Sequence, residues 1–96
     1  ENTILILGDM AELGKDELNI HIELLKNLKK YEVFVTGNLF REAIKHLEKS
    51  NAKYFNGSDD FPKKILLKKL EEGKNLYFKG SRSSKMEQYL NLIIND

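Results

Sequence analysis

Charged and hydroxyl side chains gather in two glycine-containing segments, and each segment follows directly on a run of apolar or β-branched residues. The first segment covers residues 8–14 (GDMAELG) and the second covers residues 79–84 (KGSRSS). Carboxylates in the first could hold an ammonium group, a ribose hydroxyl or a metal-bound water. The second offers hydroxyls, cations and backbone N–H groups, which suit a phosphate or a carboxylate. The candidate binding residues are therefore Asp9, Glu12, Lys79, Ser81 and Arg82.

Both segments also have a purely structural interpretation. Asp9 could accept hydrogen bonds from local backbone N–H groups in a strand-to-helix turn. Ser84 could cap the helix that follows, since Glu87 lies at the spacing of a capping box. Lys79 and Arg82 would then be ordinary solvated side chains. The residues alone leave both interpretations open.

The elements that must position these segments follow from the hydrophobic pattern. Four short β-like runs, at residues 3–7, 33–36, 53–55 and 76–79, each precede a helix-like segment. The first, second and fourth runs are nearly continuous in apolar or β-branched residues, which is typical of strands covered on both faces. Alternating strands and helices predict parallel pairing. The expected fold is a three-layer, Rossmann-like α/β domain with a mainly parallel sheet of four or more strands and helices on both faces.

Apolar stripes and capping residues predict four helices. The first runs over about 16–30, the second begins at a capping Asn38, and the third follows residues 58–60 and ends at Gly73. The fourth begins just after Ser84 and carries a stripe that we expect to be buried. This stripe consists of Met86, Tyr89, Leu90, Ile93 and Ile94.

The expected strand order brings the two candidate segments, residues 8–14 and 79–84, together. If the order is 3-2-1-4, the first and fourth strands are neighbours at the point where the order reverses. Ligands of open parallel sheets bind outside the carboxyl ends of the strands at such a point. Residues 8–14 and 79–84 would then line one crevice.

Composition limits the classes of function. The 96 residues fit a single domain spanning 1–96. Sixteen Lys and Arg nearly balance 15 Asp and Glu, so nucleic acid is not the expected partner. The sequence has no cysteine, which excludes disulfides and thiolate chemistry. Two histidines are too few for a histidine-rich metal cluster, and we expect His21 to pack or lie at the surface rather than take part in chemistry. No metal site is predicted.

The expected location is the cytoplasm, without a membrane partner. No apolar run approaches the ~20 residues needed to span a bilayer, and no signal-peptide pattern occurs. The sequence begins Glu1-Asn2-Thr3 and enters a strand almost at once, from which we expect a piece of a longer protein.

Two other classes of protein share some of these sequence features. Neither a G-x-G-x-x-G dinucleotide motif nor a Walker A sequence occurs. A receiver-type signalling module needs a phosphorylatable aspartate at the end of a central strand, but the second and third predicted strands run into residues 35–37 (VTG) and 55–57 (FNG). A non-catalytic Rossmann-like module that binds a nucleotide or another protein is the alternative that stays open.

Taken as a spaced pair, the two segments resemble the C-terminal domain of Mur ligases. The likeness rests on residues 7–14 (LGDMAELG), on His21 in the next helix, and on residues 79–82 (KGSR) followed by Met86 and Glu87. It extends across almost the whole chain, and it is greatest for the members of the family that add D-alanyl-D-alanine.

The resemblance implies the third domain of a three-domain ligase of cell-wall peptidoglycan synthesis. Such an enzyme joins D-alanyl-D-alanine to UDP-N-acetylmuramoyl-tripeptide through an acyl phosphate, with hydrolysis of ATP. In that family ATP and Mg²⁺ are bound mainly by a central domain and the UDP group by an N-terminal one. Neither domain is within these 96 residues. The resemblance thus implies that this domain closes on the central domain, holds no catalytic residue or cofactor alone, and is inactive by itself.

The resemblance also suggests roles for the candidate residues. Asp9 and Glu12 match positions that could contact the incoming amine, the ribose or the water shell of magnesium. Lys79, Ser81 and Arg82 match positions that could stabilise a phosphate or the dipeptide carboxylate.

Overall fold

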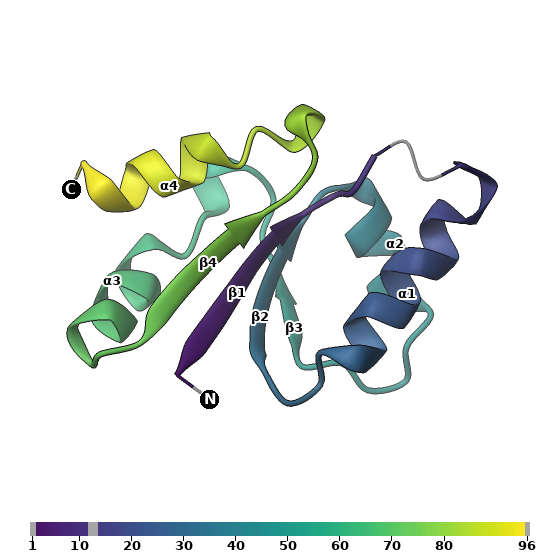
Figure 1. The fold of residues 1–96 in the computed structure, drawn as a ribbon, viewed down its shortest axis with the longest axis horizontal. Coiled ribbons are helices and arrows are strands. Elements are labelled where there is room, and N and C mark those ends of the chain that lie inside the picture. Colours follow the sequence, from purple (N-terminus) through teal and green to yellow (C-terminus); the bar gives the residue numbers. More distant parts are fainter. Residues whose placement is uncertain (1, 12–13, 96) are drawn as a thin grey trace.

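The computed structural model describes residues 2–11 and 14–95, and in it four strands form one parallel sheet in the order β3-β2-β1-β4 (Figure 1). This order confirms the predicted topology. The strands are β1 (Thr3–Gly8), β2 (Glu32–Thr36), β3 (Ala52–Tyr54) and β4 (Asn75–Lys79).

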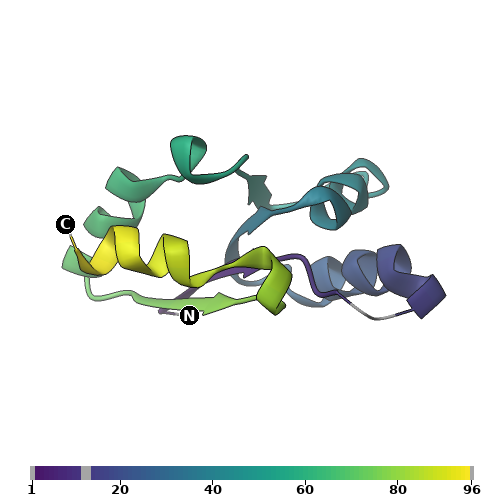
Figure 2. The ribbon, with the colours of Figure 1, turned by 90° about the horizontal axis from the view of Figure 1, so that it is seen from above.

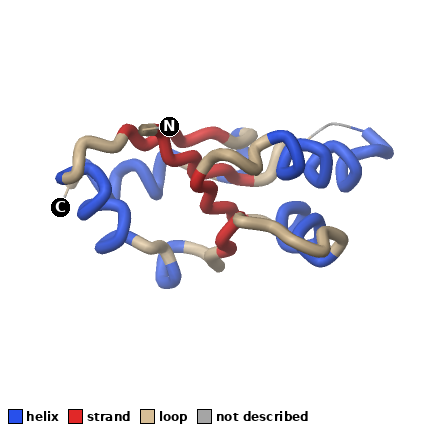
Figure 3. Tube along the Cα trace, turned by 90° about the horizontal axis from the view of Figure 1, so that it is seen from below, coloured by secondary structure: helices blue, strands red, loops and turns tan. Residues whose placement is uncertain are grey.

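Four helices cover the sheet in two pairs. They are α1 (Glu17–Asn27), α2 (Asn38–Lys45), α3 (Lys63–Glu71) and α4 (Glu87–Ile94), and single 3₁₀ turns occur at η1 (Gly14–Asp16), η2 (Ser58–Asp60) and η3 (Arg82–Ser84). In Figure 2, α1 and α2 lie together at one end of the view and α3 and α4 at the other. Figure 3 shows the strands running between the two pairs. The domain is therefore the three-layer α/β arrangement that the sequence predicts.

Alternation along β1 divides the apolar residues into two cores. Ile4 and Ile6 pack on the face covered by α3 and α4, in the same cluster as Leu66. Leu7 packs on the opposite face with Phe40 of α2. Because β1 lies between β2 and β4, its side chains contribute to both cores, and both faces of this strand are buried.

β4 differs from the prediction because it is not covered on both faces. Its exposure alternates along the strand, and Tyr77 is 51% exposed. Tyr77 pairs in register with Leu5, on the side of the sheet where α1 lies. The helices on that side pack over the other strands, so this face of β4 stays open beside α1.

The strand order also bears on the receiver-type alternative. Receiver domains use the order 2-1-3-4-5, in which the third strand pairs with the first. Here β3 pairs with β2 at the edge of the sheet, and β1 pairs with β4. The topology therefore excludes a receiver-type arrangement of these four strands.

Two of the predicted helices need correction. α1 ends at Asn27, not near residue 30, because the N–H of Leu28 bonds to the carbonyls of Leu24 and Leu25 and closes the last turn. In α4, Leu90 and Ile94 are exposed, although the other members of its predicted apolar stripe are buried. No helix in the described part of the chain is long and apolar enough to cross a membrane.

The core on the α3 and α4 face can be tested with two adjacent positions of α3. Leu66 is fully buried, whereas Ile65 is 51% exposed. Leu66→Ala should lower the free energy of unfolding by about 2–5 kcal/mol, because it leaves a cavity. Ile65→Ala should change it by only about 0.5 kcal/mol. Urea denaturation measures both variants, and equal losses would contradict this packing.

Candidate functional site

The loops that follow β1 and β4 are joined through one carbonyl group. The Asp9 carbonyl oxygen accepts hydrogen bonds from the backbone N–H of Ser81 at 3.1 Å and from the Ser81 hydroxyl at 2.9 Å. The Ser84 hydroxyl donates to the same oxygen at 2.6 Å. Two segments more than 70 positions apart therefore meet at the carboxyl edge of the sheet.

The carboxylate of Asp9 caps a helix that is distant in sequence. Its two oxygens accept hydrogen bonds from the backbone N–H groups of Leu39 and Phe40, at 3.0 and 3.1 Å, in the first turn of α2. The prediction that Asn38 caps this helix is wrong, because Asn38 is its first residue and Asp9 satisfies the free N–H groups. The negative charge also lies at the positive end of the helix dipole.

Two glycines make these contacts possible. A Cβ on Gly8 would lie 2.7 Å from Cβ of Ser84 and would also meet the sulfur of Met86. Gly37 precedes α2 with a φ of 108°, and a side chain there would collide with the Asp9 carboxylate. The backbone can approach this closely only where no side chain intervenes.

His21 binds the N–H end of the same peptide group, the one whose carbonyl belongs to Asp9. Its side chain is fully buried and packs edge-on against Phe40, with ring centroids 4.7 Å apart. The backbone N–H of Met10 donates to Nε2 at 3.0 Å, so Nε2 is an acceptor, and Nδ1 donates to the carbonyl of Glu17 at 2.6 Å. The expectation of a packing role for His21 is confirmed, and its ring nitrogens tie α1 to the β1 loop.

The predicted capping box at α4 is wrong. Ser84 lies in the 3₁₀ turn η3, and its hydroxyl is directed to the Asp9 carbonyl instead of to α4. Lys85 then adopts a left-handed conformation with a φ of 51°, and α4 begins at Glu87 without a side-chain cap. The stronger partner for Ser84 is a carbonyl across the loop, which the local sequence does not reveal.

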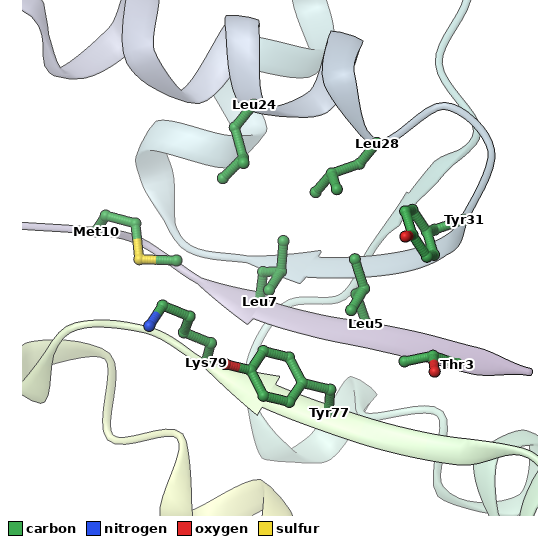
Figure 4. A pocket seen from close by; sticks show the side chains of 9 residues that line it. All are labelled: Thr3, Leu5, Leu7, Met10, Leu24, Leu28, Tyr31, Tyr77 and Lys79. Carbon is green, nitrogen blue, oxygen red and sulfur yellow. The ribbon is translucent and has the colours of Figure 1, made fainter. Parts of the chain in front are cut away.

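Lys79 lies apart from the other candidates. It ends β4 on the same side of the sheet as Tyr77 and lines a mostly apolar groove of about 450 Å³ between that strand and α1. Figure 4 shows its side chain in this groove with Met10, opposite Leu24 of α1 and Leu28, the residue that follows this helix. The structure therefore does not bring Lys79 together with Asp9.

The remaining candidates divide between two hollows at the edge of the sheet. Ser81 and the exposed Arg82 line one of about 350 Å³, together with Ala11 and Ser83. No salt bridge to Arg82 occurs within the described residues, so its guanidinium is free to meet an anion there. Glu12 lies outside the described residues.

Asp9 lines the second hollow, which we call the polar cleft. The cleft has a volume of about 280 Å³, and it is lined by Asp9, Thr36, Gly37, Asn38, Ser83, Ser84 and Tyr89. Since Ser83 lines both hollows, they adjoin. Thr36, Asn38 and Tyr89 were not among the predicted site residues. The only available signal was that Thr36 and Asn38 flank a glycine at the carboxyl end of a strand next to β1.

The donor set of the described residues does not form a metal centre. Nowhere in residues 2–11 and 14–95 do three or more His, Asp or Glu side chains converge as metal ligands. Among the described residues that line the polar cleft, the only carboxylate is that of Asp9, and it already accepts two N–H hydrogen bonds. The geometry instead suits hydrogen bonding in the polar cleft and anion contact at Arg82.

The fold and this edge define a small Rossmann-like α/β domain with binding features at its topological switch point. No model of a protein family matches the sequence.

The capping role of Asp9 predicts a loss of stability when its carboxylate is removed. Asp9→Ala should lower the free energy of unfolding by about 1–2 kcal/mol, because two N–H groups of α2 lose their partner. Asp16→Ala is the matched control, because Asp16 occupies the N-cap position of α1 without a side-chain capping bond. Thermal or urea unfolding measures both variants. A larger loss for Asp16→Ala would show that the Asp9 bonds contribute little.

The hydrogen bonds of His21 predict a neutral ring protonated at Nδ1. Nitrogen-15 NMR of the imidazole should show this tautomer for His21 and solvent-like behaviour for the exposed His46. His21→Phe keeps a ring beside Phe40 but removes both bonds, so the amide of Met10 should exchange with solvent faster. Unchanged exchange of that amide would contradict the role of His21.

Proposed function

We propose that this chain is the C-terminal domain of a Mur ligase, of the kind that adds D-alanyl-D-alanine: UDP-N-acetylmuramoyl-tripeptide–D-alanyl-D-alanine ligase. The observation that carries the proposal is the junction between the two motif-bearing loops. The resemblance rests on residues 7–14 and 79–82 together with His21, Met86 and Glu87. Ser81 and Ser84 bond directly to the Asp9 carbonyl. Because these hydrogen bonds join the two motifs at the carboxyl edge of the sheet, we assign both motifs to one proposed site.

In the proposed enzyme, this domain completes a site whose other half lies on a central domain. ATP and Mg²⁺ would be held mainly by that central domain, and ATP would supply the phosphoryl group that activates the tripeptide carboxylate. Closure of the C-terminal domain would exclude water from a hydrolysable acyl phosphate. The proposed location of this peptidoglycan synthesis step is the cytoplasm.

The contacts of each candidate residue suggest a different role for it in the proposed enzyme. Arg82 and Ser81, which line the hollow of about 350 Å³, are suited to an anionic group such as a phosphate or the dipeptide carboxylate. Asp9 acts first as an organiser, since its carboxylate holds α2 and its carbonyl holds the β4 loop. Lys79 faces the groove beside α1, which points to contact with another segment rather than with the same anion.

The second candidate function is a non-catalytic Rossmann-like module that binds a nucleotide or another protein. The polar cleft favours it, because the cleft offers hydrogen-bonding groups without an activated nucleophile. The two candidates differ in what the complete polypeptide containing this chain should do.

The test is an assay of that complete polypeptide with ATP, Mg²⁺, UDP-N-acetylmuramoyl-tripeptide and D-alanyl-D-alanine. Phosphate release should require both the tripeptide and the dipeptide. Arg82→Ala should raise KM for the dipeptide, or lower kcat/KM, by roughly 10–100-fold, because a charge-assisted hydrogen bond to an anion is lost. Lys64→Ala, an exposed cation on α3, is the matched control and should change neither constant.

The 96-residue chain alone should show no tripeptide-dependent ATP turnover. Turnover by the isolated chain would refute the proposed division of labour between domains. Phosphate release by the complete polypeptide that does not depend on the dipeptide would refute the ligase function. The binding module would then be the remaining candidate function.

A further inference from the structure

Two largely buried residues of the polar cleft each carry a hydroxyl group without a protein partner among the described residues. Thr36 is only 8% exposed and Tyr89 only 4%, and both line the cleft. Neither side chain makes a hydrogen bond to any residue that the structure describes. A hydroxyl that opens to a cleft without a protein partner bonds water there, and a hydroxyl of a ligand can replace that water.

The position of the Tyr89 hydroxyl is set by the core behind it. Its ring packs against Phe55 and Phe61, with centroid distances of 5.1 and 5.2 Å, so the ring has little freedom. Among the described residues, no fully enclosed side-chain nitrogen or oxygen lacks a hydrogen-bond partner. The hydroxyls of Tyr89 and Thr36 therefore reach open space, and for both residues that space is the cleft.

The other groups of the lining determine which ligand fits. Asn38 adds a side-chain amide that is also without a partner among the described residues, and Ser84 adds a hydroxyl oxygen. The single charge is the Asp9 carboxylate, which already accepts two N–H groups at the start of α2. No Lys, Arg or His is among the described residues that line the cleft. A phosphate would thus meet a carboxylate and no cation, whereas hydroxyl groups can both donate to and accept from this lining.

We propose that the polar cleft binds a neutral, hydroxyl-rich group of the size of a single sugar ring. Thr36, Asn38 and Tyr89 recognise its hydroxyls, and the remaining lone pairs of Asp9 accept from them. The volume of about 280 Å³ is sufficient for one sugar ring. The proposal is independent of the ligase assignment, because it uses only the lining of the cleft.

The experiment is a titration of the nitrogen-15-labelled 96-residue chain, followed by amide chemical shifts. The probes are D-ribose, adenosine and inorganic phosphate. Adenosine should shift the amides of Thr36, Asn38 and Ser84, and phosphate should leave those of Thr36 and Asn38 unchanged. The same shifts with D-ribose would identify a free sugar as sufficient, whereas shifts with adenosine alone would identify a nucleoside as the source of the ring.

Two variants test the hydroxyls directly. Tyr89→Phe keeps the packed ring and Thr36→Val keeps the buried shape, so each removes little besides a hydroxyl. Each should raise the dissociation constant of adenosine about fivefold, as expected for one lost hydrogen bond. Tyr77→Phe removes a hydroxyl outside the cleft and should leave the dissociation constant unchanged. Unaltered nitrogen-15 spectra away from the mutated site would show that each variant is folded.

Three results would overturn the proposal. They are an absence of shifts at these amides with both adenosine and D-ribose, shifts of Thr36 and Asn38 with phosphate alone, and equal affinity of folded Tyr89→Phe and the parent chain. If the cleft binds adenosine while the complete polypeptide shows no ligase activity, the ligase assignment fails and the cleft stands. If the complete polypeptide shows ligase activity while the cleft binds neither adenosine nor D-ribose, the ligase assignment stands and the cleft proposal fails.

Discussion

The carboxyl edge of this domain depends on the two polar ends of one residue. The Asp9 carbonyl holds the loop after β4, while its carboxylate holds the first turn of α2. An aspartate can make both sets of bonds because its short side chain places the carboxylate close to its own backbone. The carboxylate can then bond α2 while the carbonyl bonds the loop after β4. Three segments that follow three adjacent strands are thereby fixed relative to one another, and each hollow at this edge takes its shape from them.

The neighbouring residues make that arrangement rigid. His21 binds the peptide N–H of Met10 from α1, so the β1 loop is held on both sides of the Asp9 carbonyl. Gly8 and Gly37 leave room for Ser84 and for the Asp9 carboxylate. A preorganised edge needs little rearrangement to receive a ligand, which lowers the entropic cost of binding. In the proposed binding role, these residues act through geometry and need not touch the ligand.

The sequence predicts the fold better than it predicts the site, and the reason is the range of the interactions. Hydrophobic alternation and helix periodicity are local, so the four βα units follow from them. The order 3-2-1-4, which the structure has, was expected because it is the usual order in half of a doubly wound sheet. The cap of α2 comes from Asp9, and the partner of Ser84 is the Asp9 carbonyl, more than 70 positions away. Local rules assigned these roles to Asn38 and to a capping box, because they contain no information about contacts across the sheet edge. The hydroxyls of Thr36 and Tyr89 were missed for the same reason.

The competing interpretations of the first loop prove to be compatible. Asp9 bonds backbone N–H groups, as the structural interpretation expects, but those groups belong to α2 and not to its own turn. Because this bonding occupies much of the carboxylate, a strong electrostatic role toward a ligand passes to Arg82, whose guanidinium has no acidic partner in the described part of the chain. The edge is thus divided into a cationic hollow and a polar cleft whose described lining contains no cation, and the two share Ser83. A ligand with one anionic and one hydroxylated part would match both hollows at once. The single crevice expected from the sequence, with four charged residues and Ser81, would not separate these two parts.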